Sequence, residues 1–224
     1  MMFGDFIVVD DLADAFAEQV IEAYRNRSDD IFSIALAGGT QARSCYERLA
    51  AASEGIIDWL SVNVYWGDER CVPPDDPDSN QLLGRQALLE RVGAANAVYP
   101  MNWEEGPDAY QLRIGQVGQL DVVHLGVGPD GHTASLFPDS PALDADPGQL
   151  VALNADPSGR NVHTRMTLTY AGIARARLVV FTIGGTAKRD VVAQLLAGAD
   201  LPAARVRADR VVWLVDRDAA PAAA

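Results

Sequence analysis

Short apolar runs alternate with amphipathic stretches along the whole chain, and this alternation limits the possible folds more than any other feature. Six runs predict strands: residues 7–9, 32–36, 62–66, 122–127, 178–183 and 211–215. Helical spacing of apolar residues fills the intervals at residues 12–24, 43–52 and 80–92 and from near Thr186. Strands that alternate with helices are typical of β-α-β units. We therefore predict an α/β fold, a Rossmann-like doubly wound, mostly parallel sheet with helices on both faces.

Length and composition favour one compact enzyme-sized unit. The chain has 224 residues, of which 49% are hydrophobic, and this is enough to bury a full core. We expect a single domain over residues 1–218 and a disordered tail at residues 219–224. No apolar run approaches the roughly 20 residues of a membrane span, and no basic and apolar leader opens the chain.

Charge and cysteine content exclude further classes of protein. A net charge of −13 argues against a nucleic-acid partner, because such binding needs Lys and Arg to neutralise phosphates. Because this net charge repels anions, an anionic substrate would need cationic side chains at its binding site. Cys45 and Cys71 are too few for a disulfide framework or a zinc site. We expect a reduced, cytoplasmic protein with no metal and no membrane contact.

Four of the predicted strands end in glycines followed by polar side chains. These strand ends are residues 37–40, 67–70, 128–132 and 184–188. The carboxyl ends of parallel strands meet at one edge of a sheet, which is where ligands bind in open α/β folds. We therefore expect the four segments to converge on one active site.

The segment GPDGHTASLFP at residues 128–138 carries the leading candidate for chemistry, His132. It presents an imidazole and the carboxylate of Asp130 in one glycine-rich turn. His124 lies inside a predicted strand and is interpreted as a core histidine, and His163 as a solvent-facing one. No pair of histidines has metal-ligand spacing.

Two other strand ends could bind an anion. Gly38, Gly39 and Thr40 open a helix, where backbone N–H groups and a hydroxyl suit an anion; the alternative is an ordinary turn with Thr40 as N-cap. Lys188 is the only lysine among 18 basic residues and lies early in a predicted helix. We favour phosphate binding there over a chance surface lysine.

Residues 68–70 place three charges at the end of one strand. Arg70 either pairs with its neighbours on the surface or binds a phosphate bidentately, with Asp68 or Glu69 holding sugar hydroxyls.

Residues 126–131 match the dinucleotide pattern G-x-G-x-x-G. The match is weak, because prolines interrupt the following helix and the expected acidic residue is missing.

Taken in order, these motifs resemble those of the 6-phosphogluconolactonases, whose superfamily includes glucosamine-6-phosphate deaminase. The segments that carry the resemblance are AGGT (37–40), YWGDERCVPPDDPDSN (65–80), LGVGPDGHTASLFP (125–138), RMTLT (165–169) and IGGTAK (183–188). The family's first loop usually reads like SGGSTP. Here Ala37, Gln41 and Ala42 replace its serine, its second hydroxyl residue and its proline, so part of that phosphate contact is in question.

The resemblance implies hydrolysis of 6-phospho-D-glucono-1,5-lactone to 6-phosphogluconate in the pentose phosphate pathway, without a cofactor. His132 would be the general base for water, and Asp130 would fix its orientation and tautomer. Turn N–H groups would stabilise the oxyanion. The implied substrate-binding residues are Gly38, Gly39, Thr40, Asp68, Arg70, Asn80, Arg165 and Lys188.

Three alternatives stay open at this point. An amino-sugar-phosphate isomerase or deaminase would use Asp68 to abstract a proton from C2. A non-catalytic sugar-phosphate sensor and a generic NAD-binding protein are the other two. We expect a monomer or a weak homodimer.

Overall fold

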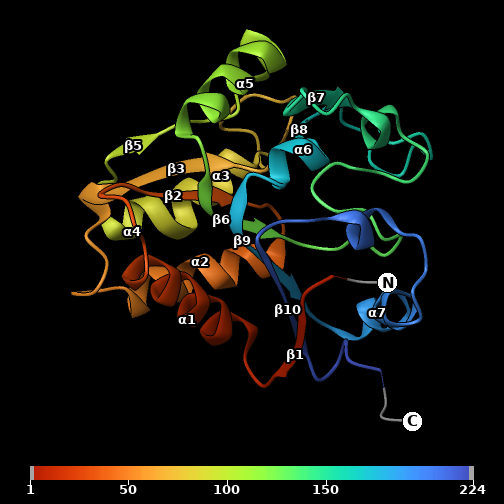
Figure 1. Ribbon diagram of the computed structural model, residues 1–224, viewed down its shortest axis with the longest axis horizontal. Coiled ribbons are helices and arrows are strands. Elements are labelled where there is room, and N and C mark those ends of the chain that lie inside the picture. Colours follow the sequence, from red (N-terminus) through yellow and green to blue (C-terminus); the bar gives the residue numbers. More distant parts are fainter. Residues whose placement is uncertain (1–2, 222–224) are drawn as a thin grey trace.

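The computed structural model describes residues 3–221, and within them the strands form two sheets (Figure 1). The larger sheet is parallel and has the strand order β1-β10-β9-β6-β2-β3-β5. Its strands are β1 (Asp5–Val9), β10 (Arg210–Asp216), β9 (Ala176–Ile183), β6 (Leu120–Leu125), β2 (Phe32–Leu36), β3 (Val62–Trp66) and β5 (Ala97–Val98). Every residue of β2 and β6 is buried, because both faces of a parallel sheet are covered.

The helices fall into two groups on the two faces of this sheet. Connections after β1, β2 and β3 move toward the β5 edge, whereas connections after β5, β6 and β9 return toward the β1 edge. Because crossovers between parallel strands are right-handed, the two groups lie on opposite faces. The first group is α1 (Leu12–Arg25), α2 (Thr40–Ala52), α3 (Asn80–Gly84) and α4 (Glu90–Val92). The second group is α5 (Gly106–Val117), α6 (Tyr170–Ile173) and α7 (Arg189–Leu196).

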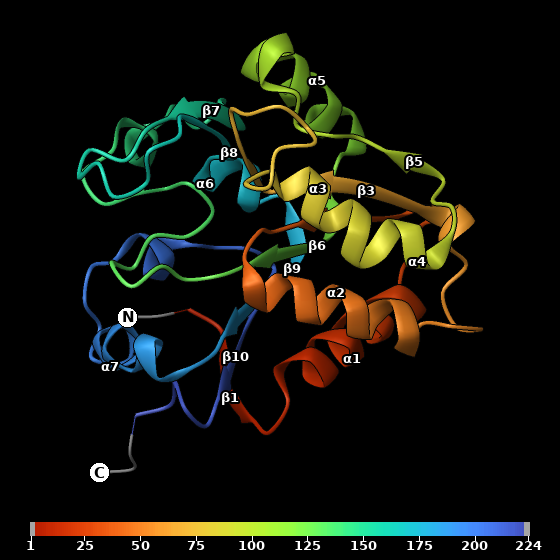
Figure 2. The same cartoon turned by 180° about the vertical axis from the view of Figure 1, so that it is seen from behind.

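The strand order reverses direction between β2 and β6. Chain segments that leave these adjacent strands turn to opposite faces, so a crevice opens at their carboxyl ends. In both Figure 1 and Figure 2, α1 and α2 lie side by side, and α5 lies at the opposite end of the molecule from α7. No helix within residues 3–221 combines the length and the apolar character that a bilayer crossing requires.

A smaller antiparallel sheet stands beside the crevice. Its order is β4 (Asp68–Arg70), β8 (Arg165–Leu168) and β7 (Val151–Asn154). The chain passes from β3 into β4 through Gly67, whose carbonyl accepts a 2.8 Å hydrogen bond from the N–H of Leu168. Figure 2 shows β7 next to α5. The small sheet therefore delivers Asp68, Arg70 and Arg165 to one side of the crevice.

The fold class predicted from the sequence is confirmed, and each of the six predicted strands corresponds to a strand of the large sheet. The predicted strand at 122–127 ends earlier, at Leu125, and the predicted helix at 80–92 contains a π-helical turn at Arg85–Leu89. The small sheet, β5, α5 and α6 were not predicted. In α5 only Tyr110 and Ile114 are buried, so its helical pattern is weak.

The expected disordered tail does not begin at Ala219. That residue is fully buried, and its N–H donates a 2.7 Å hydrogen bond to Asp216 Oδ1. The N–H of Ala220 donates to the carbonyl of Asp216 at 2.9 Å. The prediction is wrong at these positions because Ala219 packs into the core next to β10. Residues 222–224 lie outside the part that the structure describes.

Candidate active site

A cavity of about 240 Å³ occupies the crevice between β2 and β6. His132 lines it together with seven of the eight expected binding residues: Gly38, Gly39, Asp68, Arg70, Asn80, Arg165 and Lys188. The eighth, Thr40, lines an adjoining space of about 590 Å³ that shares Gly39 and Lys188 with the first. The four polar strand ends therefore converge, as the parallel arrangement predicted.

The turn after β6 holds His132 against Asp130. His132 Nδ1 lies 2.5 Å from Asp130 Oδ1, and the His132 N–H donates to the same oxygen at 3.2 Å. Gly128 lies so close that a Cβ atom there would overlap the imidazole and the Asp130 carboxylate. Gly131 has a φ of +82°, a left-handed conformation that favours glycine. The glycines of this motif are thus required by packing and by backbone geometry.

The electrostatics of this pair keep Asp130 ionised. Partial burial alone would raise the pKa of its carboxyl group, but the adjacent His132 outweighs that effect and the pKa is lowered. With Nδ1 engaged by Asp130, Nε2 is the remaining ring nitrogen, and no residue within 3–221 forms a hydrogen bond with it. The imidazole also contacts the Phe137 ring, at 5.0 Å between centroids.

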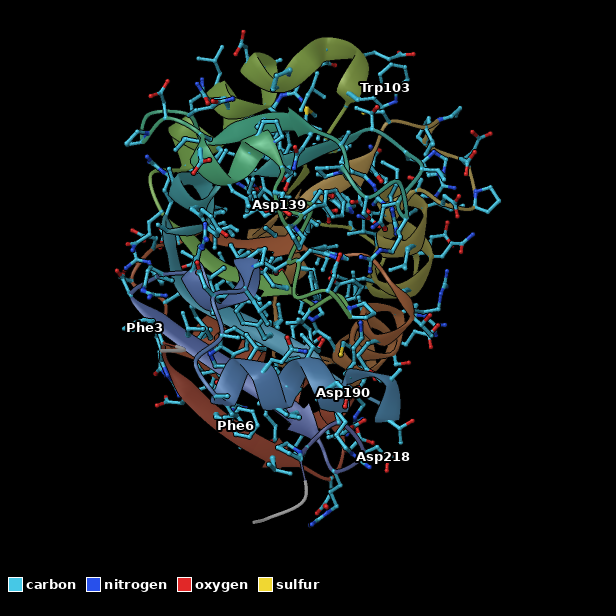
Figure 3. All side chains as sticks on the ribbon, turned by 90° about the vertical axis from the view of Figure 1, so that its right-hand side faces the viewer. Phe3, Phe6, Trp103, Asp139, Asp190 and Asp218 are labelled. Atoms are coloured by element: carbon cyan, nitrogen blue, oxygen red, sulfur yellow. The ribbon has the colours of Figure 1, made fainter. Side chains whose placement is uncertain are left out.

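The turn is fixed to its surroundings at several points. Thr133 Oγ1 donates to the Gly126 carbonyl at 2.8 Å, and Ser135 Oγ donates to Asp68 Oδ2 at 2.6 Å. Ala134 lines the cavity with a φ of +47°, which is uncommon for a residue with a side chain. In Figure 3, Asp139, which follows this segment, lies between Trp103 above and Asp190 of α7 below.

Asp68, Asn80 and Arg70 form a hydrogen-bonded wall on the other side of the cavity. Asn80 Nδ2 donates to the Asp68 carbonyl at 2.8 Å and to Asp68 Oδ1 at 3.2 Å, while Asn80 Oδ1 accepts from Arg70 Nη1. Gly38 packs directly on this amide, since a Cβ atom at Gly38 would overlap Asn80 Oδ1. Arg165 Nη1 lies 3.9 Å from Asp68 Oδ2. Both guanidinium groups therefore lie against the same carboxamide–carboxylate pair.

Glu69 lies away from the cavity, in contrast to its neighbours. It is 1% exposed, and its carboxylate accepts hydrogen bonds from the N–H groups of Arg70, Asn80 and Gln81 at 2.7–2.8 Å. Burial raises its pKa. Glu69 thus fixes the start of α3, and the carboxylate beside His132 is Asp130.

Lys188 contacts the turn after β6 directly. Its Nζ donates to the Val127 carbonyl at 2.6 Å. Burial lowers the pKa of Lys188, and the negative charge of Asp130 opposes that shift. Lys188 ends a short 3₁₀ helix, Thr186–Lys188, and α7 begins after it at Arg189, whereas the sequence predicted a helix from near Thr186.

Thr40 is the first residue of α2, and the N-cap is Gly39, with a φ of +99°. The alternative that Thr40 caps the helix is therefore wrong. Thr40 is exposed at the entrance of the adjoining space, where its hydroxyl and the α2 N-terminus remain available to an anion.

The other two histidines do not line the cavity that holds His132, although His124 borders the adjoining space. His124 is buried and has hydrogen-bond partners on both ring nitrogens, Tyr46 Oη and Thr182 Oγ1, each at 2.8 Å. Its interpretation as a core histidine is confirmed. His163 Nε2 lies 3.0 Å from Asp78 Oδ2 at the surface. Within residues 3–221, no three His, Cys, Asp or Glu side chains cluster as metal ligands would.

One polar side chain of the cavity was missed by sequence reasoning. Asn161 belongs to the loop between β7 and β8 and lines the cavity with Arg70 and Arg165. The surrounding letters DPSGRN indicate a turn. No local pattern indicates that this turn lies against the loops of the large sheet.

The chain is similar to known proteins over most of its length. A family model described as glucosamine-6-phosphate isomerases/6-phosphogluconolactonase matches residues 7–213. The 6-phosphogluconolactonase of Mycobacterium tuberculosis is 38% identical over 208 residues, covering 84% of this chain and 83% of that protein. The Synechocystis 6-phosphogluconolactonase is 35% identical over 206 residues, covering 84% of this chain and 82% of that protein.

Solved structures extend the likeness to three dimensions. The 6-phosphogluconolactonase of Thermotoga maritima has a TM-score of 0.82 at 29% identity and covers 95% of this chain and 99% of its own. A monomeric glucosamine-6-phosphate deaminase has a TM-score of 0.81 at 17% identity, with 96% and 98% covered, a likeness of fold alone. The chain belongs to the family of glucosamine-6-phosphate isomerases and 6-phosphogluconolactonases.

Proposed function

We propose that this protein hydrolyses 6-phospho-D-glucono-1,5-lactone to 6-phosphogluconate, a step of the pentose phosphate pathway, with His132 as the general base. The 6-phosphogluconolactonases among its relatives support the reaction. One observation carries the mechanism: the Asp130-paired imidazole lines the same small cavity as three cationic side chains, Arg70, Arg165 and Lys188.

The cations account for binding of the phosphate group. A net charge of −13 repels a phosphorylated sugar at long range, so capture depends on the local field. Arg70 and Arg165 supply guanidinium groups that suit phosphate oxygens, Lys188 supplies an ammonium group, and the N–H groups of Gly38 and Gly39 add donors. Binding of the phosphate group by these residues holds the carbonyl carbon C1, at the other end of the substrate, in place for attack.

His132 acts on the water molecule. Asp130 holds Nδ1–H, so Nε2 accepts a proton from water while the water oxygen bonds to C1. Backbone N–H groups of the turn stabilise the oxyanion that develops. The bond between C1 and the ring oxygen then breaks, and the proton on Nε2 passes to that oxygen as it becomes the C5 hydroxyl. The step consumes one water and needs no covalent intermediate.

Asp68 is poorly placed for the rival isomerase or deaminase chemistry. Its Oδ2 accepts from Ser135 Oγ at 2.6 Å and its Oδ1 from Asn80 Nδ2 at 3.2 Å. Both oxygens of this carboxylate are therefore already held by donors of the protein. Its hydrogen bonds instead support a role in orienting Asn80 and Arg165.

The decisive experiment is an assay with freshly generated lactone, in which 6-phosphogluconate formation is measured above the spontaneous hydrolysis rate. We expect saturable acceleration by the wild-type chain and no release of ammonia from glucosamine 6-phosphate. Hydrolysis at the spontaneous rate would contradict the proposal, and ammonia release would favour the deaminase. We also propose that the protein is cytoplasmic and is a monomer or a weak homodimer. Light scattering of the purified protein tests the oligomeric state.

A further inference from the structure

Asn161, in the loop between β7 and β8, lines the cavity, and its side-chain oxygen accepts no hydrogen bond from residues 3–221. We propose that Asn161 in this loop binds a ring hydroxyl of the sugar phosphate and thereby contributes to substrate specificity. We assign Asp156 as the positioning residue that holds Asn161 in place. The inference rests on the proposed function, because it takes the ligand to be a phosphorylated sugar lactone.

Asp156 organises the loop through both of its carboxylate oxygens. Oδ1 accepts from the N–H and the Oγ of Ser158 at 2.8 and 2.7 Å, and Oδ2 accepts from the N–H and the Nδ2 of Asn161 at 3.0 and 2.8 Å. Burial alone would raise the pKa of Asp156, but these hydrogen bonds outweigh it and lower the pKa. Backbone and side chain of Asn161 are thus both fixed by one carboxylate.

The loop is also fixed to the strand that carries Arg70. The N–H of Cys71, next to Arg70, donates to the Thr164 carbonyl at 2.9 Å, and His163 Nε2 lies 3.0 Å from Asp78 Oδ2. These contacts join the β7–β8 loop to the segment that follows β4. Asn161 therefore has a defined position relative to Arg70 on the other side of this contact.

The chemistry of the Asn161 amide suits a hydroxyl group better than a phosphate group. Its Nδ2 is committed to Asp156, and within residues 3–221 its Oδ1 accepts no hydrogen bond. An acceptor pairs with a hydroxyl donor and is repelled by phosphate oxygens. Arg70 and Arg165, which line the same cavity, have only donors.

Asn80 provides the contrast. It was expected to bind the substrate, yet its Oδ1 already accepts from Arg70 and its Nδ2 donates to Asp68. Both halves of that amide are engaged inside the protein. Of the two asparagines that line the cavity, Asn161 is the one with an amide oxygen left for a ligand.

The test compares Asn161→Ala with the wild type on the natural lactone and on 6-phospho lactones that each lack one ring hydroxyl. Loss of one hydrogen bond to a hydroxyl predicts a rise in KM of about three- to tenfold, with kcat within about twofold because the reacting atoms are untouched. One deoxy lactone should bind the two proteins equally well. Asp156→Ala should reproduce the same selectivity, and Val162→Ala, a change at a side chain 81% exposed in the same loop, should not.

Two results would overturn the inference. In one, Asn161→Ala leaves KM unchanged; in the other, it weakens all the lactones equally, deoxy forms included, which indicates a structural role only. Melting temperatures of the variants report whether the loop change has altered folding. A wild-type chain that hydrolyses no lactone contradicts the proposed function as well, so the two failures are distinguishable.

Discussion

Strand β6 and the turn that follows it each hold a histidine, and the two sites differ in every property that matters for acid–base chemistry. His124 in β6 is fully enclosed between two hydroxyl groups, those of Tyr46 and Thr182. Burial lowers its pKa to about 3, so the ring is neutral at physiological pH. His132 in the turn lines a cavity and contacts the carboxylate of Asp130.

The two rings differ in their hydrogen-bond partners and in their access to the cavity. Hydroxyl partners satisfy a neutral imidazole and leave it no proton to exchange with a ligand. A carboxylate partner stabilises the imidazolium that forms when the ring accepts a proton. The same residue type, eight positions apart in the chain, is therefore structural in the strand and suited to proton transfer at the strand end.

The largest expected effect is that of His132→Ala. Loss of the general base predicts a fall in kcat of about 10² to 10⁴-fold, with KM nearly unchanged because the cations remain. Initial rates with fresh lactone, corrected for spontaneous hydrolysis, measure it. Binding of 6-phosphogluconate by calorimetry is the control for an intact cavity. Wild-type turnover in this variant would remove His132 from the mechanism.

Asp130→Asn tests the partner directly. The amide keeps the size of the side chain but holds the imidazole in a less suitable tautomer and orientation. Misplacement of a catalytic group costs about 100-fold in rate, so we expect a loss of this order in kcat. The pH dependence of kcat should also change, because the charge beside Nδ1 is gone. An unchanged pH profile and rate would mean that the Asp130 contact only shapes the turn.

Lys188→Ala tests whether the ammonium group beside the turn after β6 acts on binding. Charged hydrogen bonds contribute about 1.5–3 kcal/mol, so KM should rise by about 10- to 100-fold while kcat changes little. Arg189→Ala is the matched control, since Arg189 is the exposed next residue and its guanidinium donates to the Asp218 carbonyl. Equal effects of both substitutions would point to the general field rather than a phosphate contact.

The sequence predicts well those parts of the fold whose signal is local. Strands β2 and β6 are apolar over their full length and buried on both faces, so their pattern alone identifies them. The small sheet is harder, because β4 is the charged segment Asp68–Arg70 and forms by pairing with β8, nearly 100 residues later. Its existence depends on contacts that no short window contains.

The residues of the candidate site also divide into those that the local sequence indicates and those that depend on distant contacts. His132, Asp68 and Lys188 follow glycines at strand ends, so the sequence indicates both their chemistry and their meeting place. The roles of Glu69 and Asn161 could not be predicted, because they depend on which groups lie around them in space. Glu69 turns inward to the start of α3, and the side chain of Asn161, which lines the cavity, donates a hydrogen bond to Asp156.

His124→Leu reverses the comparison, since it should affect stability and leave catalysis nearly intact. The substitution removes both ring contacts and leaves the Thr182 hydroxyl without its partner in a buried site. Unpaired buried polar groups cost about 1–3 kcal/mol, which urea denaturation measures as a lower midpoint. We expect kcat within about threefold of wild type, because the imidazole lies outside the reacting end of the cavity. A loss of kcat like that of His132→Ala would break the distinction between the two sites.

The last prediction concerns the contribution of His124 to the pH dependence of stability. Its pKa is lowered from 6.5 to about 3 in the folded chain, so between these values the unfolded chain binds the extra proton. The stability from the neutral ring is therefore complete above pH 6.5 and falls as the pH drops toward 3, by at most about 1.4 kcal/mol per pH unit. Buried carboxylates with raised pKa values, such as Glu69 and Asp121, oppose this slope at the acidic end. The difference in slope between wild type and His124→Leu, from urea titrations at pH 5 to 8, isolates the histidine. Parallel slopes would mean that the ring is not held neutral by burial.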